Sequence, residues 1–278
     1  MKILVTGANG YIGHKVICEL LKHPVTVVAV DIKGDHVHPD AQFIQADIFE
    51  ERPDWYTYLG SPDVCLHLAW REGFNHKSPR HMGDLSSHYR FLTSMMDGGL
   101  PQLAVMGTMH EVGYHEGAID ENTPCNPISL YGISKNALRQ SVLAYAREKG
   151  TLCQWLRAFY IYGDDLFGSS IFCKLRQAVA EGKETFPFTT GKNKFDFIHE
   201  LDLAAGIVAT VLQREVSGII NICSGKPVSL AEQVEWYIRE NNLPIRLDYG
   251  KYPDRPYDSP CIYGDDTKFR AIMDKVKV

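Results

Sequence analysis

A tyrosine and a lysine four residues apart, Tyr131 and Lys135, form the pair in this sequence best suited to chemistry. They lie just inside a predicted helix, where residues i and i+4 share a face. The Lys135 ammonium can therefore lie beside the Tyr131 hydroxyl. Free tyrosine titrates near pH ~10, and a nearby cation lowers that pKa because it favours the phenolate. Tyr131 is therefore a candidate acid or base that exchanges a proton with a substrate oxygen.

The same spacing occurs twice more in the chain. Tyr11 and Lys15 form one further pair, and Tyr145 and Lys149 form the other. Taken alone, any such pair is more simply interpreted as an ordinary contact on a helix surface. The sequence around Tyr131 must decide whether it differs from the other two tyrosines.

The composition is that of a globular protein with a sizeable core. The chain has 278 residues, 45% apolar and 23% charged, with a net charge of −5 and a pI of about 6.1. We expect one large domain, or one domain with a small annex. Lysine and arginine do not cluster, which argues against a nucleic-acid partner. No apolar run approaches the ~20 residues of a membrane span, so no membrane association is expected.

Cysteine and histidine spacing gives no sign of a metal site. The seven cysteines are scattered and form no CxxC pair, which is typical of reduced thiols in a cytoplasmic protein. The start of the chain lacks the apolar region of a signal peptide. The eleven histidines show no ligand spacing, and we interpret four of them as solvated loop residues: His36, His38, His76 and His81.

Short β-rich runs alternate with helical patterns, which predicts βαβ units and a mainly parallel sheet. The predicted strands are residues 2–6, 25–30, 42–46, 64–69, 103–106 and 152–158. The predicted helices are residues 11–22, 49–59, 84–96 and 130–149. The predicted fold class is α/β, with a Rossmann-type, doubly wound parallel sheet.

The alternation changes beyond residue 163. Helices are predicted at 169–182, 201–213 and 230–241, with short strands at 196–199 and 219–223. We predict a Rossmann domain over 1–163, to which 196–223 returns. Residues 164–195 and 224–278 are expected to form a small, discontinuous C-terminal substrate lobe.

Three glycines, Gly7, Gly10 and Gly13, separate the first strand from the first helix. Glycines at this position allow a tight turn and let backbone N–H groups approach a pyrophosphate at a helix N-terminus. Asp31 follows the second strand and can accept hydrogen bonds from an adenosine ribose, while it would repel a 2′-phosphate. Asp31 thus favours NAD(H) over NADP(H), a preference that nearby Lys33 can weaken; the simpler interpretation is a turn residue.

Together these residues resemble the extended short-chain dehydrogenase/reductases, within the NAD-dependent epimerase/dehydratase group. The resemblance extends over nearly the whole chain, with ordered matches at 6–13, 67–69, 156–163, 196–199 and 221–225. It implies that the cofactor-binding residues include Gly7, Gly10, Tyr11, Ile12, Gly13, Asp31, Asp47, Ile48, Leu68, Ala69, Tyr131 and Lys135.

The resemblance also implies roles for three residues and a substrate class. Thr108 would bind the sugar oxygen, Tyr131 would exchange its proton, and Lys135 would bias Tyr131 and bind the nicotinamide ribose. Relatives of this kind mostly act on nucleotide-linked sugars, which the C-terminal lobe holds. Homodimers are common among them, so a homodimer is expected.

The residues after Thr108 bear on the choice of reaction. Sugar dehydratases carry carboxylates directly after the catalytic threonine, where this chain has Met109 and His110. Glu111 comes one residue too late, so a dehydratase is disfavoured. GDP-fucose synthase-like enzymes have an acid/base residue at the place of His110, and histidine can move protons near neutral pH. The alternative is a substrate-contacting or packed histidine.

Arg255 is the candidate for a phosphate contact. Family members often have an arginine just before the strand 196–199, where this chain has Phe195, with Lys192 and Lys194 nearby. Arg255 matches a later arginine of the family and can contact a phosphate through two hydrogen bonds. A surface loop cation is the alternative interpretation.

The predicted reaction is NAD(P)H-dependent reduction of a nucleotide-linked 4-keto-6-deoxyhexose, of the dTDP-4-dehydro-6-deoxyglucose type. Tyr131 would be the general acid that protonates the new hydroxyl. A 4-epimerase with tightly held NAD is the nearest alternative. A non-catalytic NAD(P)-sensing protein is the third.

Overall fold

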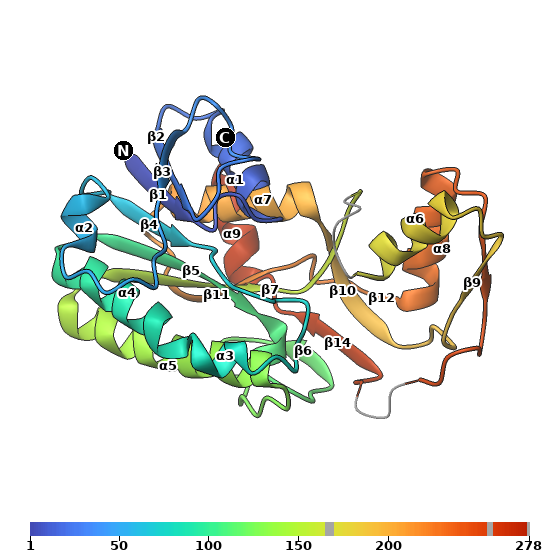
Figure 1. Cartoon of the computed structure of the whole chain (residues 1–278). Helices are drawn as coiled ribbons and strands as arrows, with labels where there is room; N and C mark the ends of the chain where they lie inside the picture. Colours follow the sequence, from blue (N-terminus) through green and yellow to red (C-terminus); the bar gives the residue numbers. More distant parts are fainter. Residues whose placement is uncertain (165–169, 255–257, 277–278) are drawn as a thin grey trace.

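A parallel sheet of seven strands runs through the described part of the chain, which covers residues 1–164, 170–254 and 258–276 of the computed structural model (Figure 1). Its strand order is β11-β7-β5-β4-β1-β2-β3. The strands are β1 (Lys2–Thr6), β2 (Thr26–Asp31), β3 (Gln42–Gln45), β4 (Val64–His67), β5 (Gln102–Thr108), β7 (Leu152–Ala158) and β11 (Gly218–Ile222). The winding changes direction beside β1, where a doubly wound sheet leaves a crevice at the carboxyl ends of its strands.

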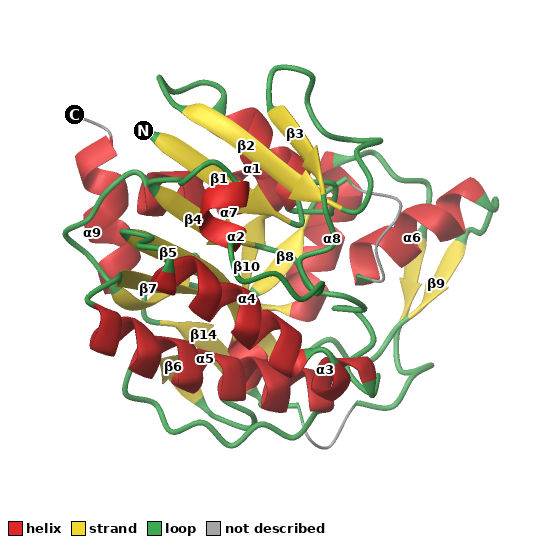
Figure 2. Cartoon of the chain, turned by 60° about the vertical axis from the view of Figure 1, so that its left-hand side comes forward, coloured by secondary structure: helices red, strands yellow, loops and turns green. Residues whose placement is uncertain are grey.

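Helices cover both faces of this sheet (Figures 1 and 2). One face packs against α1 (Gly13–Leu20), α7 (Glu200–Val211) and α9 (Thr267–Val276). The other packs against α4 (Leu85–Asp97) and α5 (Leu130–Lys149), with the short helices α2 (Trp55–Tyr58) and α3 (Arg80–Gly83) beside them. The predicted α/β fold class and doubly wound sheet are confirmed.

A smaller sheet extends beyond the first and positions the C-terminal part of the chain (Figure 1). Its path is β12-β10-β14-β6, and β8 pairs with β10. These strands are β6 (Gly117–Ile119), β8 (Tyr160–Tyr162), β10 (Lys194–His199), β12 (Pro227–Ser229) and β14 (Cys261–Gly264). The remaining elements are α6 (Ile171–Ala180), α8 (Leu230–Glu240) and the paired strands β9 (Thr185–Pro187) and β13 (Arg246–Asp248).

An apolar cluster that includes Phe172, Phe188 and Phe197 packs the C-terminal part together. The last helix, α9, instead returns to α7 and β11 on the larger sheet, although its residues fall within the predicted substrate lobe. The division of the chain into domains stays a prediction. Among the described helices, none is long and apolar enough to cross a membrane.

Some predicted elements differ from the observed ones. The helix predicted at 49–59 is reduced to α2, which begins only after Pro53, because a proline in a helix interior removes a hydrogen bond and clashes with the preceding turn. The helix predicted from residue 11 begins at Gly13, because Tyr11 and Ile12 belong to the glycine turn. Strands of three residues, such as β6 and β8, are too short to show a periodic pattern.

The buried carboxylate of Asp196 connects several elements at the end of the smaller sheet that lies next to the larger one. Its oxygens accept hydrogen bonds from the backbone N–H groups of Ser224, Gly225 and Gly264, at 2.8, 2.9 and 3.1 Å. The Ser224 hydroxyl donates a fourth, at 2.6 Å. A single side chain thereby fixes β10, the loop after β11 and the end of β14.

Replacing Asp196 by alanine should lower the free energy of unfolding by about 3 kcal/mol or more, because buried N–H donors would lose their acceptor. Urea unfolding of both proteins measures this difference. Asp35→Ala, at an exposed loop position, is the control and should stay within about 0.5 kcal/mol of the parent. Equal losses for the two variants would contradict the role of Asp196.

Candidate active site

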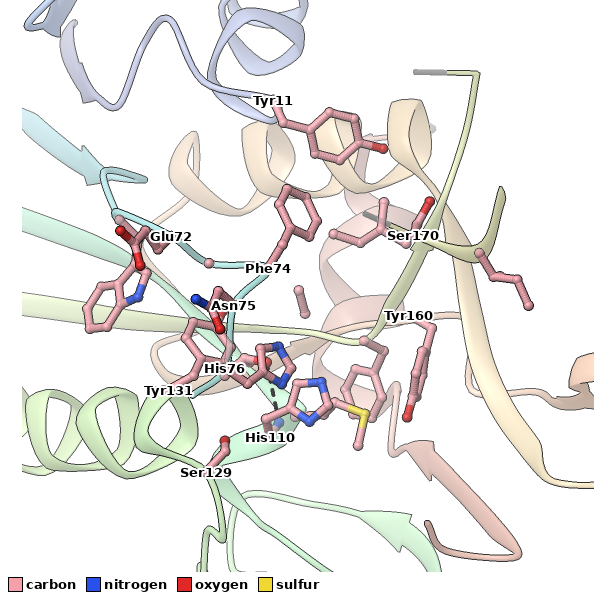
Figure 3. A pocket seen from close by; sticks show the side chains of 18 of the residues that line it. Tyr11, Glu72, Phe74, Asn75, His76, His110, Ser129, Tyr131, Tyr160 and Ser170 are labelled. Atoms are coloured by element: carbon pink, nitrogen blue, oxygen red, sulfur yellow. Dashed lines mark hydrogen bonds between the residues drawn. The ribbon is translucent and has the colours of Figure 1, made fainter. Parts of the chain in front are cut away.

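A large pocket of about 2200 Å³ opens between the carboxyl ends of the sheet strands and the C-terminal part of the chain. Every predicted cofactor and catalytic residue lines it, as does His110: Gly7, Gly10, Tyr11, Ile12, Gly13, Asp31, Asp47, Ile48, Leu68, Ala69, Thr108, His110, Tyr131 and Lys135. Figure 3 shows Tyr131, His110 and Tyr160 on its wall. Arg255 lies outside the described residues.

The glycine turn between β1 and α1 is too tightly packed for side chains. Gly7 has a φ of +71°, and a Cβ there would lie 2.6 Å from the Ala69 nitrogen. A Cβ on Gly13 would lie 2.1 Å from the Gly7 carbonyl oxygen. The turn therefore presents bare backbone at the N-terminus of α1, which fits a dinucleotide pyrophosphate.

Two carboxylates lie at or just after the carboxyl ends of β2 and β3. Asp31, at the end of β2, accepts hydrogen bonds from the N–H groups of Asn9 (3.0 Å) and Ile32 (2.7 Å). Asp47 pairs with the Arg71 guanidinium at 2.9 Å. Both carboxylates line the pocket.

Thr108 and Tyr131 are brought together where the end of β5 lies beside the first turn of α5. Thr108 ends β5 and caps the short 3-10 helix Met109–Glu111, and its N–H donates to Glu111 Oε1 at 2.7 Å. Tyr131 is the second residue of α5, and its hydroxyl is hydrogen-bonded to Thr108. The close approach requires glycine after Tyr131, because a Cβ on Gly132 would lie 2.3 Å from the His110 carbonyl oxygen.

Burial dominates the protonation of the pair. It raises the pKa of Tyr131 above its usual value, although the hydrogen bond with Thr108 opposes the rise. It lowers the pKa of Lys135 to about 7, against the opposing charge of Glu111. The expected lowering of the Tyr131 pKa is therefore wrong for the protein as described, because the dry surroundings disfavour the phenolate and the Glu111 carboxylate opposes it as well.

Lys135 is held by a backbone carbonyl and an aromatic ring. Its ammonium donates to the Met106 carbonyl at 2.7 Å and lies 3.9 Å from the centre of the Trp70 ring. Burial leaves only 3% of the residue exposed. Both of these contacts are made with neutral groups.

The other two tyrosine–lysine pairs each converge on one carboxylate. Tyr145 and Lys149 contact Asp97 Oδ1 at 2.7 and 2.8 Å on the surface. Tyr11 and Lys15 likewise contact the same oxygen of Glu200, at 2.5 and 3.5 Å. These two pairs are ordinary ion-pair and hydrogen-bond clusters.

Histidines near Tyr131 were not recognised from the sequence. The His76 ring stacks on that of Tyr131, with centroids 4.8 Å apart, and the His76 carbonyl accepts from the Tyr131 N–H at 3.2 Å. His81 is buried and hydrogen-bonded to Trp70 and to the Asn75 carbonyl. The interpretation of His76 and His81 as solvated loop residues is therefore wrong. Only the tertiary fold of the loop after β4 brings them to the site.

The surroundings of His110 favour the neutral form of its imidazole. Burial, reinforced by the charge of His76, lowers its pKa to about 3. Its ring lies 4.5 Å from that of His76 and 6.3 Å from those of Tyr131 and Tyr160. This environment favours the packed or substrate-contacting alternative over proton transfer. Among the described residues, no group of three His, Cys, Asp or Glu side chains could hold a metal ion.

Glu111 is fully buried beneath Thr108 and was missed as a site-forming residue. Its Oε1 also accepts from Trp155 Nε1 at 2.8 Å, and its Oε2 lies 3.4 Å from Arg139 Nε and 3.6 Å from Arg157 Nη2. The threonine followed three residues later by glutamate is a capping-box pattern, and this pattern was the available signal.

Replacing Glu111 by glutamine should lower the free energy of unfolding by about 3 kcal/mol or more, because it leaves the buried Arg157 guanidinium without a counter-charge. Urea unfolding measures the loss. The exposed Glu116→Gln is the matched control and should change stability by no more than about 0.5 kcal/mol. If Glu111→Gln behaved like this control, the buried ion cluster would not be a stabilising element.

Known proteins resemble this chain over its whole length. The sequence matches the NAD dependent epimerase/dehydratase family over residues 3–223. A dTDP-6-deoxy-L-talose 4-dehydrogenase (NAD(+)) from Aggregatibacter actinomycetemcomitans is 45% identical over 269 residues, covering 95% of this chain and 99% of the relative. A UDP-glucose 4-epimerase from Corynebacterium glutamicum is 27% identical, covering 100% of this chain and 89% of the relative.

Solved structures agree in fold. The UDP-glucose 4-epimerase of Thermus thermophilus in complex with NAD superposes with a TM-score of 0.83 at 20% identity, covering 98% of this chain and 92% of that one. Because the family match spans most of the sequence, the chain belongs to the NAD-dependent epimerase/dehydratase family, as the resemblance in its motifs predicted.

Proposed function

We propose that the protein is an NAD(H)-dependent oxidoreductase that reduces the 4-keto group of a dTDP-linked 6-deoxyhexose to a 4-hydroxyl group. The observation that carries the proposal is the 45% identity, over nearly the full length of both chains, to a dehydrogenase named for the 4-position of dTDP-6-deoxy-L-talose. Reduction of the ketone is the reverse of that oxidation. The corresponding ketone is shared by 6-deoxy-L-talose and its C4 epimer.

The residues of the pocket fit the nicotinamide cofactor that this reaction needs. The bare glycine turn would hold the pyrophosphate, Asp31 the adenosine ribose, and Lys135 the nicotinamide ribose. A carboxylate at Asp31 accepts ribose hydroxyls and repels a 2′-phosphate, which supports NAD(H) over NADP(H). When bound, the cofactor supplies the hydride exchange.

The chain's own residues handle the proton at the sugar oxygen. The pKa of Tyr131 is raised by burial, so its phenol is protonated before reaction and suited to donate to the oxygen that becomes the 4-hydroxyl. Thr108, hydrogen-bonded to Tyr131, would orient the same oxygen. Lys135 would stabilise the phenolate that remains after the transfer, since an adjacent ammonium favours that charge.

A nucleotide-sugar 4-epimerase is the second candidate. The more distant relatives include UDP-glucose 4-epimerases, which could use the same threonine, tyrosine and lysine. An epimerase would return the hydride to the other face of the ketone with no net change in the cofactor. The relatives named above are enzymes, which favours either reaction over NAD(P) sensing.

Incubating the protein with a dTDP-4-keto-6-deoxyhexose and NADH should convert one NADH per sugar reduced. Absorbance at the reduced-nicotinamide band and product analysis measure the two quantities together. A parallel panel of UDP-glucose and dTDP-6-deoxyhexoses with NAD tests the second candidate. Interconversion of two sugars without net cofactor change would replace reduction by epimerisation.

Tyr131→Phe should lower kcat by roughly 10²-fold to 10⁴-fold, because the proton donor at the sugar oxygen is lost. NADH binding, followed by fluorescence, should persist because the glycine turn, Asp31 and Lys135 are unchanged and phenylalanine keeps the aromatic ring. Tyr145→Phe is the matched control: it removes a phenol with the same i,i+4 lysine on the same helix, and its activity should equal that of the parent. Full activity of Tyr131→Phe would sink the proposed mechanism.

A further inference from the structure

Trp70 touches both members of the tyrosine–lysine pair. It follows β4 directly after Leu68 and Ala69, and it lines the pocket. The centre of its ring is 3.9 Å from Lys135 Nζ. Its ring also meets that of Tyr131 edge-on, with centroids 6.1 Å apart and planes at 77°. The indole therefore borders the two groups that would share charge during proton transfer.

Two histidines, His81 and His88, hold the indole ring in place. Trp70 Nε1 donates to His81 Nδ1 at 3.0 Å. Because that nitrogen accepts, the proton of a neutral His81 ring lies on Nε2, which donates to the Asn75 carbonyl at 2.8 Å. His88 stacks on the indole with centroids 4.4 Å apart and planes at 12°. The ring thus has little freedom to turn away from Lys135.

The stacked histidine is itself anchored in the sheet. His88 Nδ1 is hydrogen-bonded to His67 Nε2 at 2.9 Å, and His67 Nδ1 to the Thr6 hydroxyl at 2.8 Å. Burial lowers the pKa of His67 to about 3, with a contribution from Lys135, and lowers that of His88. Both shifts favour the neutral forms of His67 and His88, which add no competing positive charge next to the ammonium.

We propose that Trp70 is a positioning residue of the active site: its indole face holds the Lys135 ammonium in place and keeps it charged, and His81 and His88 hold the indole. The inference rests on the proposed roles of Tyr131 and Lys135. A cation over an indole is favoured electrostatically by the ring quadrupole, and most strongly where water is excluded.

The protonation state of Lys135 is sensitive to its contact with the indole. Burial brings its pKa to about 7, so at neutral pH small changes in its surroundings alter the charged fraction. In a desolvated site a cation–π contact shifts such a protonation equilibrium by roughly tenfold. The titratable groups that interact electrostatically with Lys135 include Glu111, His67 on β4 and His88 on α4, and Tyr131 lies one turn before it on α5.

A direct test measures the Lys135 pKa by NMR titration of protein labelled with ¹³C at the lysine ε-carbons, without cofactor or sugar. Trp70→Leu should lower the pKa by about one unit, because the apolar side chain cannot stabilise the ammonium. Trp70→Phe, which keeps a weaker aromatic face and is the conservative variant if leucine disturbs the fold, should lower it by less. Lys149, paired with Asp97 on the surface, is the reference in the same spectra and should not move.

A kinetic test links the contact to proton transfer. In the direction of sugar oxidation Tyr131 acts as the base, so activity rises with pH as the phenol ionises. Loss of the Lys135 charge raises the pKa of Tyr131, and the acidic limb of kcat should therefore shift to higher pH in Trp70→Leu and less in Trp70→Phe. A change in kcat with an unmoved limb would overturn the inference.

The two arms separate failure of this inference from failure of the proposed function. An unchanged Lys135 pKa in Trp70→Leu overturns the role of Trp70 whatever reaction the protein catalyses. If the parent turns over none of the dTDP-sugars, the proposed function fails, and the titration still decides whether Trp70 sustains the ammonium. The inference is supported if the Lys135 pKa falls in both variants, and falls further in Trp70→Leu than in Trp70→Phe.

Discussion

The buried carboxylate of Glu111 is the interaction on which the active site depends. It joins the end of β5 to the 3-10 helix through the Thr108 N–H, reaches β7 through Trp155, and faces the guanidinium groups of Arg139 and Arg157. A charge buried this deeply persists only where other charges and donors compensate it. Those compensating partners come from three different elements, so the position of Thr108 is set by the packing of the whole domain.

The exclusion of water that makes the buried charge of Glu111 unfavourable also shifts the pKa values of the neighbouring side chains in the pocket. The same surroundings hold the proton on Tyr131, draw the proton of Lys135 toward release, and keep His110 neutral. All three shifts oppose charge on these side chains. A ligand that brings positive charge next to Tyr131 changes this balance more than it would in water, because a low local dielectric strengthens each interaction.

Local patterns predicted much of the fold. The glycine turn, Asp31 and the order of strands and helices follow from short-range signals, and all the predicted cofactor residues line one pocket. Trp70, His76 and His81 could not be found in this way, because their contacts depend on how the loop after β4 folds over α5. The direction of the Tyr131 pKa shift was also predicted wrongly. The sequence spacing shows that a lysine is near Tyr131, but it does not show how deeply the tyrosine is buried.

The Tyr11–Glu200 hydrogen bond ties two parts of the protein that different ligands would occupy. Tyr11 belongs to the glycine turn, and Glu200 begins α7 directly after β10, the central strand of the smaller sheet. Glu200 also fills the space beside Gly163, where a Cβ would lie 2.2 Å from its Cδ. A displacement of the turn must therefore be accommodated at the root of the smaller sheet. If a dinucleotide bound at the turn and a sugar beside the smaller sheet, any coupling carried by this hydrogen bond would change both affinities by the same factor.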